Sequence, residues 1–180
     1  GGGIGPLQVD EVLGVMKAYA TRVGAGPFPT ELTDAIGEGL IDRGREYGTT
    51  TGRRRRVGWF DAVPLRYAAA VNSVSSIMLN KIDILSGLEE ILICMAYEVD
   101  GKRIDWWPSD ADVLARAKPV YERFPGWTEP LHECRTMADL PENARRYVDA
   151  LERLSGALGT SLLIAVLTTL AVVAAGVPAA

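Results

Sequence analysis

The sequence contains very few of the side chains that nucleophilic catalysis and transition-metal binding require. Among 180 residues there is one histidine, His132, and there are two cysteines, Cys94 and Cys134, which lie far apart without CxxC or CxxxH spacing. No zinc site, disulfide framework, Ser/His/Asp triad or Cys/His pair can therefore be assembled. His132 lies in a polar stretch and is interpreted as an exposed loop side chain. The low use of cysteine fits a reducing, cytoplasmic location.

An excess of positive charge is also missing. The 19 basic and 23 acidic residues give a net charge of -4, which argues against bulk nucleic-acid or anionic-membrane binding as the main activity. No GxxxxGK[ST] phosphate loop occurs. The 48% of hydrophobic residues are enough for one globular domain with a core, so any phosphate chemistry must come from local clusters.

The final part of the chain has no charge at all. From Gly156 to Ala180 no Asp, Glu, Lys or Arg occurs, and residues 162–177 are nearly all apolar. This stretch is long enough to span a bilayer, but neither a Lys/Arg cluster nor an aromatic belt flanks its far end. Two hypotheses stay open for residues 157–180: a membrane span, and a divergent or frameshifted strand.

The spacing of apolar residues predicts alternating helices and strands, which is typical of an α/β fold. Predicted helices cover residues 7–16, 31–45, 61–71 and 141–154. Predicted strands cover residues 18–23, 76–79 and 91–97, and Asp100-Gly101 predicts a hairpin turn. Residues 105–127 are polar and contain three prolines, so we expect a long loop with a short helix there.

A short motif follows the predicted strand at residues 76–79. Its residues are Asn80, Lys81, Ile82 and Asp83, which match the NKxD signature of guanine-binding proteins. A carboxylate two residues after the lysine can accept hydrogen bonds from the ring N–H and the amino group of guanine, which adenine cannot supply together. The lysine stem can cover one face of the base. Four residues also recur by chance, so the motif alone leaves an ordinary strand end equally open.

A second cluster precedes this motif and combines a hydroxyl-rich loop with four consecutive arginines. The loop contains Gly48, Thr49, Thr50, Thr51 and Gly52, followed by Arg53, Arg54, Arg55 and Arg56. Guanidinium groups bind carboxylate and phosphate in bidentate fashion, and hydroxyl and backbone N–H groups can complete an anion site. The alternative is a localisation signal or a nucleic-acid patch, which the acidic remainder of the chain disfavours.

Longer segments resemble the adenylosuccinate synthetase family. Residues 17–32 resemble its KAYxTRVGxGPFPTEL segment, residues 48–61 its GxTTGRxRRxGWxD segment, residues 81–88 its KLDVLxGL segment and residues 119–127 its PxYExxPGW segment. The matches keep the family's order from about Gly5 to Gly156. The resemblance implies that residues 1–156 are the C-terminal part of the enzyme domain. Their fold would be α/β, the C-terminal portion of a larger, mostly parallel, P-loop GTPase-like sheet with helices on its faces.

The resemblance also implies an activity and its partners. The family joins L-aspartate to IMP with GTP and Mg²⁺, giving adenylosuccinate in the first committed step of AMP synthesis. We expect a cytoplasmic homodimer when the protein is full length. The implied aspartate- and IMP-binding residues are Gly48, Thr49, Thr50, Thr51, Gly52, Arg53, Arg54 and Val23. The implied GTP-binding residues are Arg55, which would reach the phosphates, and Lys81, Ile82 and Asp83, which would recognise guanine.

Two departures from the family pattern bear on activity. Asn80 stands where the family usually has threonine, and we expect guanine recognition to survive this change. After Gly156 the family's SxGP-type turn and its arginine are absent. The phosphate loop, the acid and base and the Mg²⁺ ligands would precede Gly1, so no catalytic or metal residue is expected here. The chain alone is expected to be inactive. Alternatives are an inactive or membrane-tethered guanine-nucleotide-binding fragment, and a GTP-dependent switch without ligation.

Overall fold

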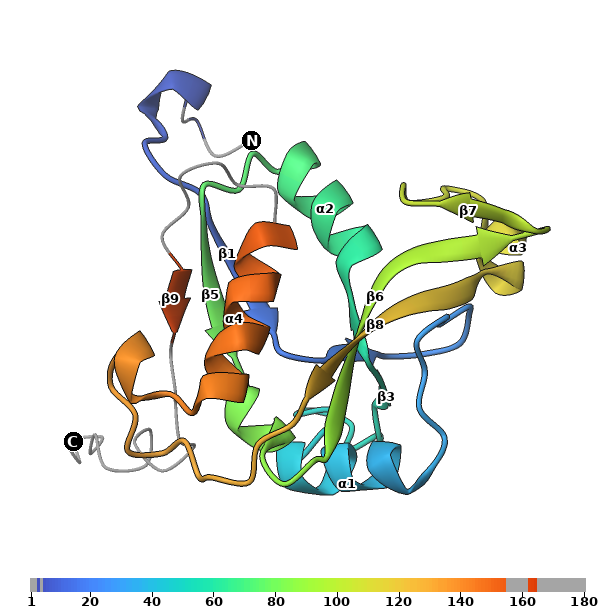
Figure 1. Cartoon of the computed structure of the whole chain (residues 1–180). Coiled ribbons are helices and arrows are strands. Elements are labelled where there is room, and N and C mark those ends of the chain that lie inside the picture. Colours follow the sequence, from blue (N-terminus) through green and yellow to red (C-terminus); the bar gives the residue numbers. More distant parts are fainter. Residues whose placement is uncertain (1–2, 4, 155–161, 165–180) are drawn as a thin grey trace, which may run out of the picture.

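A three-stranded parallel sheet forms one side of the molecule (Figure 1). The computed structural model describes residues 3, 5–154 and 162–164. The strands are β1 (Leu13–Lys17), β5 (Ser76–Asn80) and β9 (Leu162–Ile164), in the order β1-β5-β9. β5 lies in the centre of the sheet, and its Ile77 and Leu79 side chains are buried. The predicted strand at residues 76–79 is therefore confirmed.

The predicted helix at residues 7–16 is wrong. This segment forms a short 3₁₀ turn, η1 (Pro6–Gln8), followed by β1. All five residues of β1 pair with β5, from Leu13 opposite Ser76 to Lys17 opposite Asn80. Gly14 also fits this packing, because a Cβ atom there would lie 3.0 Å from the Val74 side chain. Pairing with a buried neighbouring strand thus outweighs the helical spacing of the apolar residues.

A second sheet is built around the long strand β6 (Glu90–Val99). β6 pairs in parallel with β4 (Phe60–Asp61) and antiparallel with β7 (Lys102–Ile104) and β8 (Lys118–Pro125). The predicted hairpin turn is confirmed, since Asp100 and Gly101 both have positive φ, 50° and 76°. β8 lies within residues 105–127, so the expectation of a loop with only a short helix is wrong there. The short helix itself is α3 (Ala111–Arg116).

Two further helices begin at aspartate caps. In α1 (Ala35–Gly44) the Asp34 carboxylate accepts the Gly37 N–H at 3.0 Å, and α2 (Ala62–Val71) is capped by Asp61. α1 begins four residues later than predicted because Glu31 bridges to Gly58 before the cap. The partner strand β3 (Arg56–Gly58) pairs antiparallel with β2 (Ala20–Arg22).

Helix α4 (Glu142–Leu154) covers one face of the parallel sheet (Figure 1). Its Tyr147 is fully buried, and the Tyr147 hydroxyl donates a hydrogen bond to the carbonyl of Ala18 at 2.7 Å. The Tyr147 ring also packs against Phe124 and Trp127, with ring centroids 5.9 and 6.0 Å away. The remaining elements are the 3₁₀ turns η2 (Ile82–Leu85) and η3 (Met137–Asp139).

The α/β class and the parallel sheet agree with the prediction. Within the described residues no helix is long and apolar enough to cross a membrane. Of the predicted apolar tail at residues 157–180, only β9 lies within the described residues, and it pairs with β5.

Candidate functional site

The carboxyl ends of β1 and β5 bring together segments that are far apart in the sequence. Lys17 is opposite Asn80 in the register, and the Ala18 N–H donates to the Asn80 carbonyl at 2.8 Å. Ligands bind at this end of the strands in open α/β sheets. The NKxD-like segment therefore begins at the same edge at which β1 ends and leads to Tyr19.

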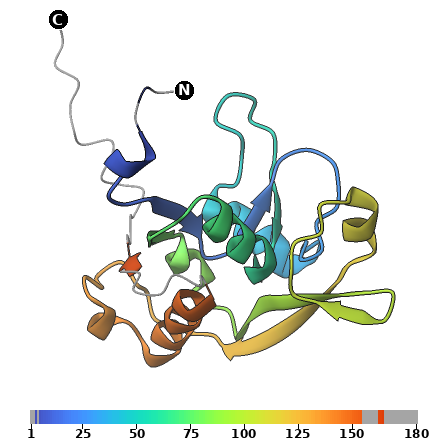
Figure 2. The same cartoon turned by 90° about the horizontal axis from the view of Figure 1, so that it is seen from above.

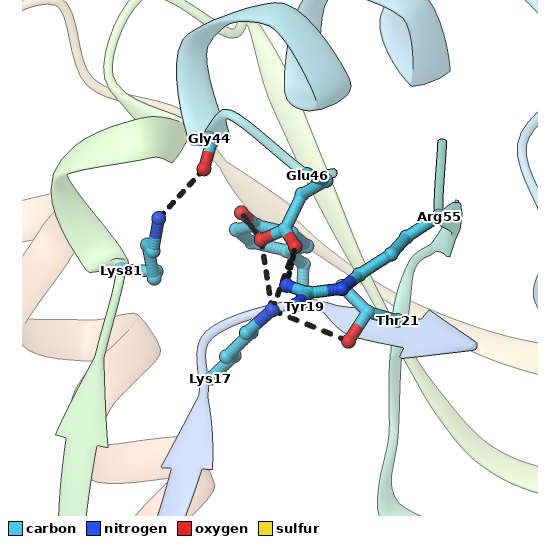
Figure 3. Close-up of polar contacts among 7 residues, drawn as sticks. All are labelled: Lys17, Tyr19, Thr21, Gly44, Glu46, Arg55 and Lys81. Atoms are coloured by element: carbon cyan, nitrogen blue, oxygen red, sulfur yellow. Dashed lines mark hydrogen bonds and ion pairs between the residues drawn. The ribbon is translucent and has the colours of Figure 1, made fainter. Parts of the chain in front are cut away.

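The buried carboxylate of Glu46 lies at this edge (Figure 3). Glu46 stands between α1 and the loop of residues 47–55, which we call the arginine loop. Lys17 Nζ is 2.8 Å from each Glu46 carboxylate oxygen, the Tyr19 hydroxyl donates at 2.6 Å, and Arg55 Nη1 donates at 2.9 Å. Burial raises the pKa of Glu46, but the hydrogen bonds from Lys17, Tyr19 and Arg55 outweigh it and hold the pKa below its usual range. Glu46 is therefore ionised at neutral pH.

Tyr19 remains a hydrogen-bond donor in this cluster. Burial, and then the neighbouring Glu46 carboxylate and the charge of Asp83, raise the pKa of Tyr19 well above its ordinary value. Gly44 lies directly against this hydroxyl, because a Cβ atom at Gly44 would clash with the Tyr19 oxygen. The end of α1 can therefore approach Tyr19 only with glycine at this position.

The loop formed by residues 47–55 projects away from the rest of the chain (Figure 2). Its base is held by the Arg55 N–H, which donates to the Glu46 carbonyl at 2.8 Å, and by a bridge between Tyr47 and Arg54. At its tip Gly52 has φ 65°, a conformation that favours glycine. The hydroxyl-bearing residues at the tip are exposed: Thr49, Thr50 and Thr51.

The four consecutive arginines fall into two pairs with different surroundings. Arg54 forms an ion pair with Glu38, and Arg56 binds both carboxylate oxygens of Glu31 at 2.6 Å. Arg55 instead shares one carboxylate with a lysine. The exposed Arg53 side chain has no hydrogen-bond or ion-pair partner in the described part of the chain. Of these four arginines, Arg53 and Arg55 are thus the two whose guanidinium groups are not fully neutralised by a carboxylate and can bind an anionic ligand.

The NKxD-like segment turns sharply as it leaves β5. Lys81 has φ 64°, and its Nζ donates to the Gly44 carbonyl at 2.7 Å, so its side chain spans from β5 to the end of α1 (Figure 3). Ile82 is fully buried and anchors the segment. Asp83 is half-buried, and its carboxylate has no hydrogen-bond donor among the described residues. Asp83 can therefore accept hydrogen bonds from a ligand.

Val23 lies at a different place, immediately after β2. Its side chain is 72% exposed, next to Gly24, whose φ of 82° bends the chain. The Gly24 and Gly26 carbonyls accept hydrogen bonds from Arg56 at 3.2 and 2.8 Å. The exposed position of Val23 leaves it available to a ligand.

Sequence reasoning missed Glu46, Lys17 and Tyr19 as parts of the site. The available signal was weak: Glu46 is an isolated acid just before a loop with four arginines. No group of three or more His, Cys, Asp or Glu that could hold a metal ion is found in the described part of the chain.

Comparisons with known proteins identify the family of this chain. The family model for adenylosuccinate synthetase matches residues 1–161. The chain is 53% identical over 156 residues to the adenylosuccinate synthetase of Streptococcus sanguinis (strain SK36), covering 87% of this chain and 36% of that protein. It is also similar to the structure of fully ligated adenylosuccinate synthetase from Plasmodium falciparum. That match has a TM-score of 0.85 and 41% identity, and covers 91% of this chain and 39% of the other.

The chain therefore spans a little over a third of the length of these relatives. The match covers both the arginine loop and the NKxD-like segment. The chain belongs to the adenylosuccinate synthetase family.

Proposed function

We propose that this chain supplies the aspartate loop and the guanine site of a GTP-dependent ligase that joins L-aspartate to IMP. The observation that carries the proposal concerns the edge where Arg55 shares its carboxylate partner with a lysine. At this edge Asp83 has no hydrogen-bond donor among the described residues, and the exposed Arg53 lies two residues before Arg55 on the adjoining loop. Two cations can bind the carboxylate and phosphate groups of the reactants, while the acid selects the base. The activity belongs to purine synthesis.

The exposed loop has the properties of a substrate-binding element. Thr49, Thr50 and Thr51 offer hydroxyl groups, and Gly48 and Gly52 give the backbone the freedom to close around a small anion. Arg53 at the end of this tip would pair with the aspartate carboxylate. Arg54, held to Glu38, would keep the loop oriented towards α1.

Guanine recognition is assigned to Lys81, Ile82 and Asp83. Asp83 would accept two hydrogen bonds from the base, while the Lys81 stem covers its face. Val23 would line the IMP pocket. Phosphoryl transfer depends mainly on positioning and charge stabilisation, so Arg55 would act on the GTP phosphates.

The remaining parts of the reaction are assigned to protein segments outside this chain. The phosphate loop, the acid and base and the Mg²⁺ ligands would come from the portion of the relatives that this chain does not match, so the isolated chain would not catalyse ligation. A cytoplasmic homodimer of the full-length protein completes the proposal.

The test is a graft of residues 1–156 into the Streptococcus sanguinis relative, in place of its matched segment. We expect GTP-dependent formation of adenylosuccinate, with GTP preferred over ATP. Asp83→Asn should reduce that preference about a hundredfold or more, because the amide cannot accept both guanine N–H groups. Steady-state kinetics with each nucleotide measures the ratio of kcat/KM values.

The matched control is Asp105→Asn, which changes an exposed aspartate directly after β7 and should leave the nucleotide preference unchanged. Equal use of GTP and ATP by the unmodified graft would refute the guanine assignment. A folded graft that binds guanine nucleotides but forms no product would instead support a binding fragment without ligase activity.

A further inference from the structure

The buried Glu46 carboxylate has more positive charge around it than it needs. Glu46 carries one negative charge, whereas Lys17 and Arg55 each carry one positive charge and both contact it. Among the side chains that contact one another here, the positive charges therefore exceed the negative charges by one. Glu46 is only 1% exposed, so it needs at least one cation in contact with it, because a buried charge without a counter-charge is costly.

Lys17 is the better placed of the two cations to stay. Its Nζ is 2.8 Å from each carboxylate oxygen, and the Tyr19 hydroxyl adds a third hydrogen bond at 2.6 Å. Lys17 Nζ is also 3.3 Å from the Thr21 hydroxyl, which fixes its direction (Figure 3). If Arg55 were removed, Glu46 would still have a counter-charge and two donor groups.

Arg55 is held much more loosely. Its guanidinium makes a single contact with Glu46, 2.9 Å from Nη1, whereas Lys17 Nζ contacts both carboxylate oxygens. The guanidinium of its neighbour Arg56 makes four hydrogen bonds. Arg56 is therefore a firmly held arginine in this fold, and Arg55 is not. The Arg55 backbone is fixed by its own N–H bond to the Glu46 carbonyl at 2.8 Å. The side chain can therefore change partner while the backbone stays in place.

We propose that Glu46 is the resting partner of Arg55, and that Lys17 and Tyr19 keep Glu46 satisfied when the Arg55 guanidinium leaves it for a phosphate group. Lys17 and Glu46 are then positioning residues that act through Arg55. Without Lys17, the same movement would leave a buried carboxylate with no counter-charge, which is costly. This inference rests on the proposed function in one respect, namely that Arg55 contacts phosphate.

The experiment follows the Arg55 side chain directly in the 180-residue chain. Protein labelled with ¹⁵N-arginine is titrated with inorganic pyrophosphate, and the Arg55 Nε–Hε signal, assigned with Arg55→Lys, is followed by NMR. Pyrophosphate lacks a base, so the result does not depend on guanine recognition. We expect the Arg55 signal to shift and to saturate.

Variants separate a change of partner from simple charge attraction. Without pyrophosphate, the Arg55 signal of Glu46→Gln should differ from that of wild type. At saturating pyrophosphate the two signals should converge, because in both proteins the Arg55 guanidinium no longer contacts residue 46. Lys17→Gln should weaken pyrophosphate binding about tenfold, since Arg55 then becomes the only cation of Glu46. The control Lys118→Gln, an exposed lysine on β8, should change the affinity by less than about twofold.

The proposal is overturned if the Arg55 signal stays unchanged at the highest pyrophosphate concentration, a result that the wild-type chain alone can give. It is also overturned if the saturated wild-type and Glu46→Gln signals stay apart, because Arg55 then remains on Glu46. Either result leaves the guanine preference of the graft intact as a separate measurement. Thermal unfolding of each variant shows that it is folded before titration.

Discussion

Asp61 is a buried acid whose protonation is linked to folding. It accepts hydrogen bonds from the Tyr97 hydroxyl at 2.6 Å and from the Val63 N–H at 3.1 Å. Burial raises the pKa of Asp61 to about 6, while these hydrogen bonds and the nearby Arg66 limit the rise. The folded protein therefore binds this proton more tightly than the unfolded chain. The resulting stabilisation is complete below about pH 4 and is lost as the pH rises through about 6.

We predict that the free energy of unfolding falls between about pH 4 and pH 6, and that this slope is smaller in Asp61→Asn. The difference is at most about 3 kcal/mol, because each unit of pKa change corresponds to about 1.4 kcal/mol. Urea unfolding at a series of pH values measures it. Asp105→Asn, at an exposed aspartate, should keep the wild-type slope. Identical slopes for wild type and Asp61→Asn would show that Asp61 is not the responsible group.

The sequence could predict the residues with local signatures and not those that depend on distant partners. Lys81 and Asp83 are recognisable because their spacing forms a motif, and Arg53 because it follows a glycine- and threonine-rich loop. Glu46 contacts Lys17 across 29 positions, and only the pairing of β1 with β5 and the placement of α1 bring the two together. A long-range ion pair has no local pattern.

At the level of elements, two of the three glycines in helix α1, Gly37 and Gly39, have opposite surroundings. A Cβ atom at Gly37 would clash with the backbone carbonyl of Leu32, where the chain enters the helix. At Gly39 the nearest atoms to a Cβ are at the flexible end of Arg43, 3.8 Å away. The same substitution should therefore have opposite effects within one helix.

We predict that Gly39→Ala raises the free energy of unfolding by about 0.5 to 1 kcal/mol, because alanine favours helix over the flexible unfolded chain. Gly37→Ala should lower it by roughly 1 to 3 kcal/mol, since the backbone of Leu32 must move. Chemical unfolding of both variants and wild type gives the comparison. Equal effects at the two positions would contradict the close approach at Gly37.

Strong local signals predicted most elements, and tertiary pairing accounts for the errors. α4 has a clear amphipathic spacing, and β5 is a continuous apolar run. The apolar spacing of β1 suits both a helix and a strand, and only pairing with β5 decides for the strand. β8 is half exposed and has prolines near both ends, so its strand character comes from pairing with β6.

At the scale of the whole molecule, the edge strand β1 leaves apolar side chains uncovered. Leu13 and Val15 are 47% and 65% exposed, and on the adjoining helix α2 Tyr67 and Val71 are 52% and 59% exposed. An apolar pocket of about 180 Å³ lies between β1 and α2. Parallel sheets are normally covered on both faces, so this surface is expected to associate in water.

We predict that the isolated chain self-associates with increasing concentration, and that Val15→Lys weakens this association about tenfold by placing a charge on the apolar surface. Sedimentation velocity over a range of concentrations measures the effect. Trp106→Lys changes a similarly exposed apolar residue elsewhere and should leave the association nearly unchanged. A monomeric wild-type chain at high concentration would count against this surface.

The hydrogen bond between Tyr147 and Ala18 joins residues that are 129 positions apart, and this has a consequence for synthesis. At ribosomal speeds the segment around Ala18 is made roughly ten seconds before α4 exists. Phe124 and Trp127 are made late in that interval, and they have no Tyr147 ring to pack against until α4 follows. A nonsense mutation shortly before α4 would therefore yield a product that lacks α4 and has an open core, which cellular proteases would degrade.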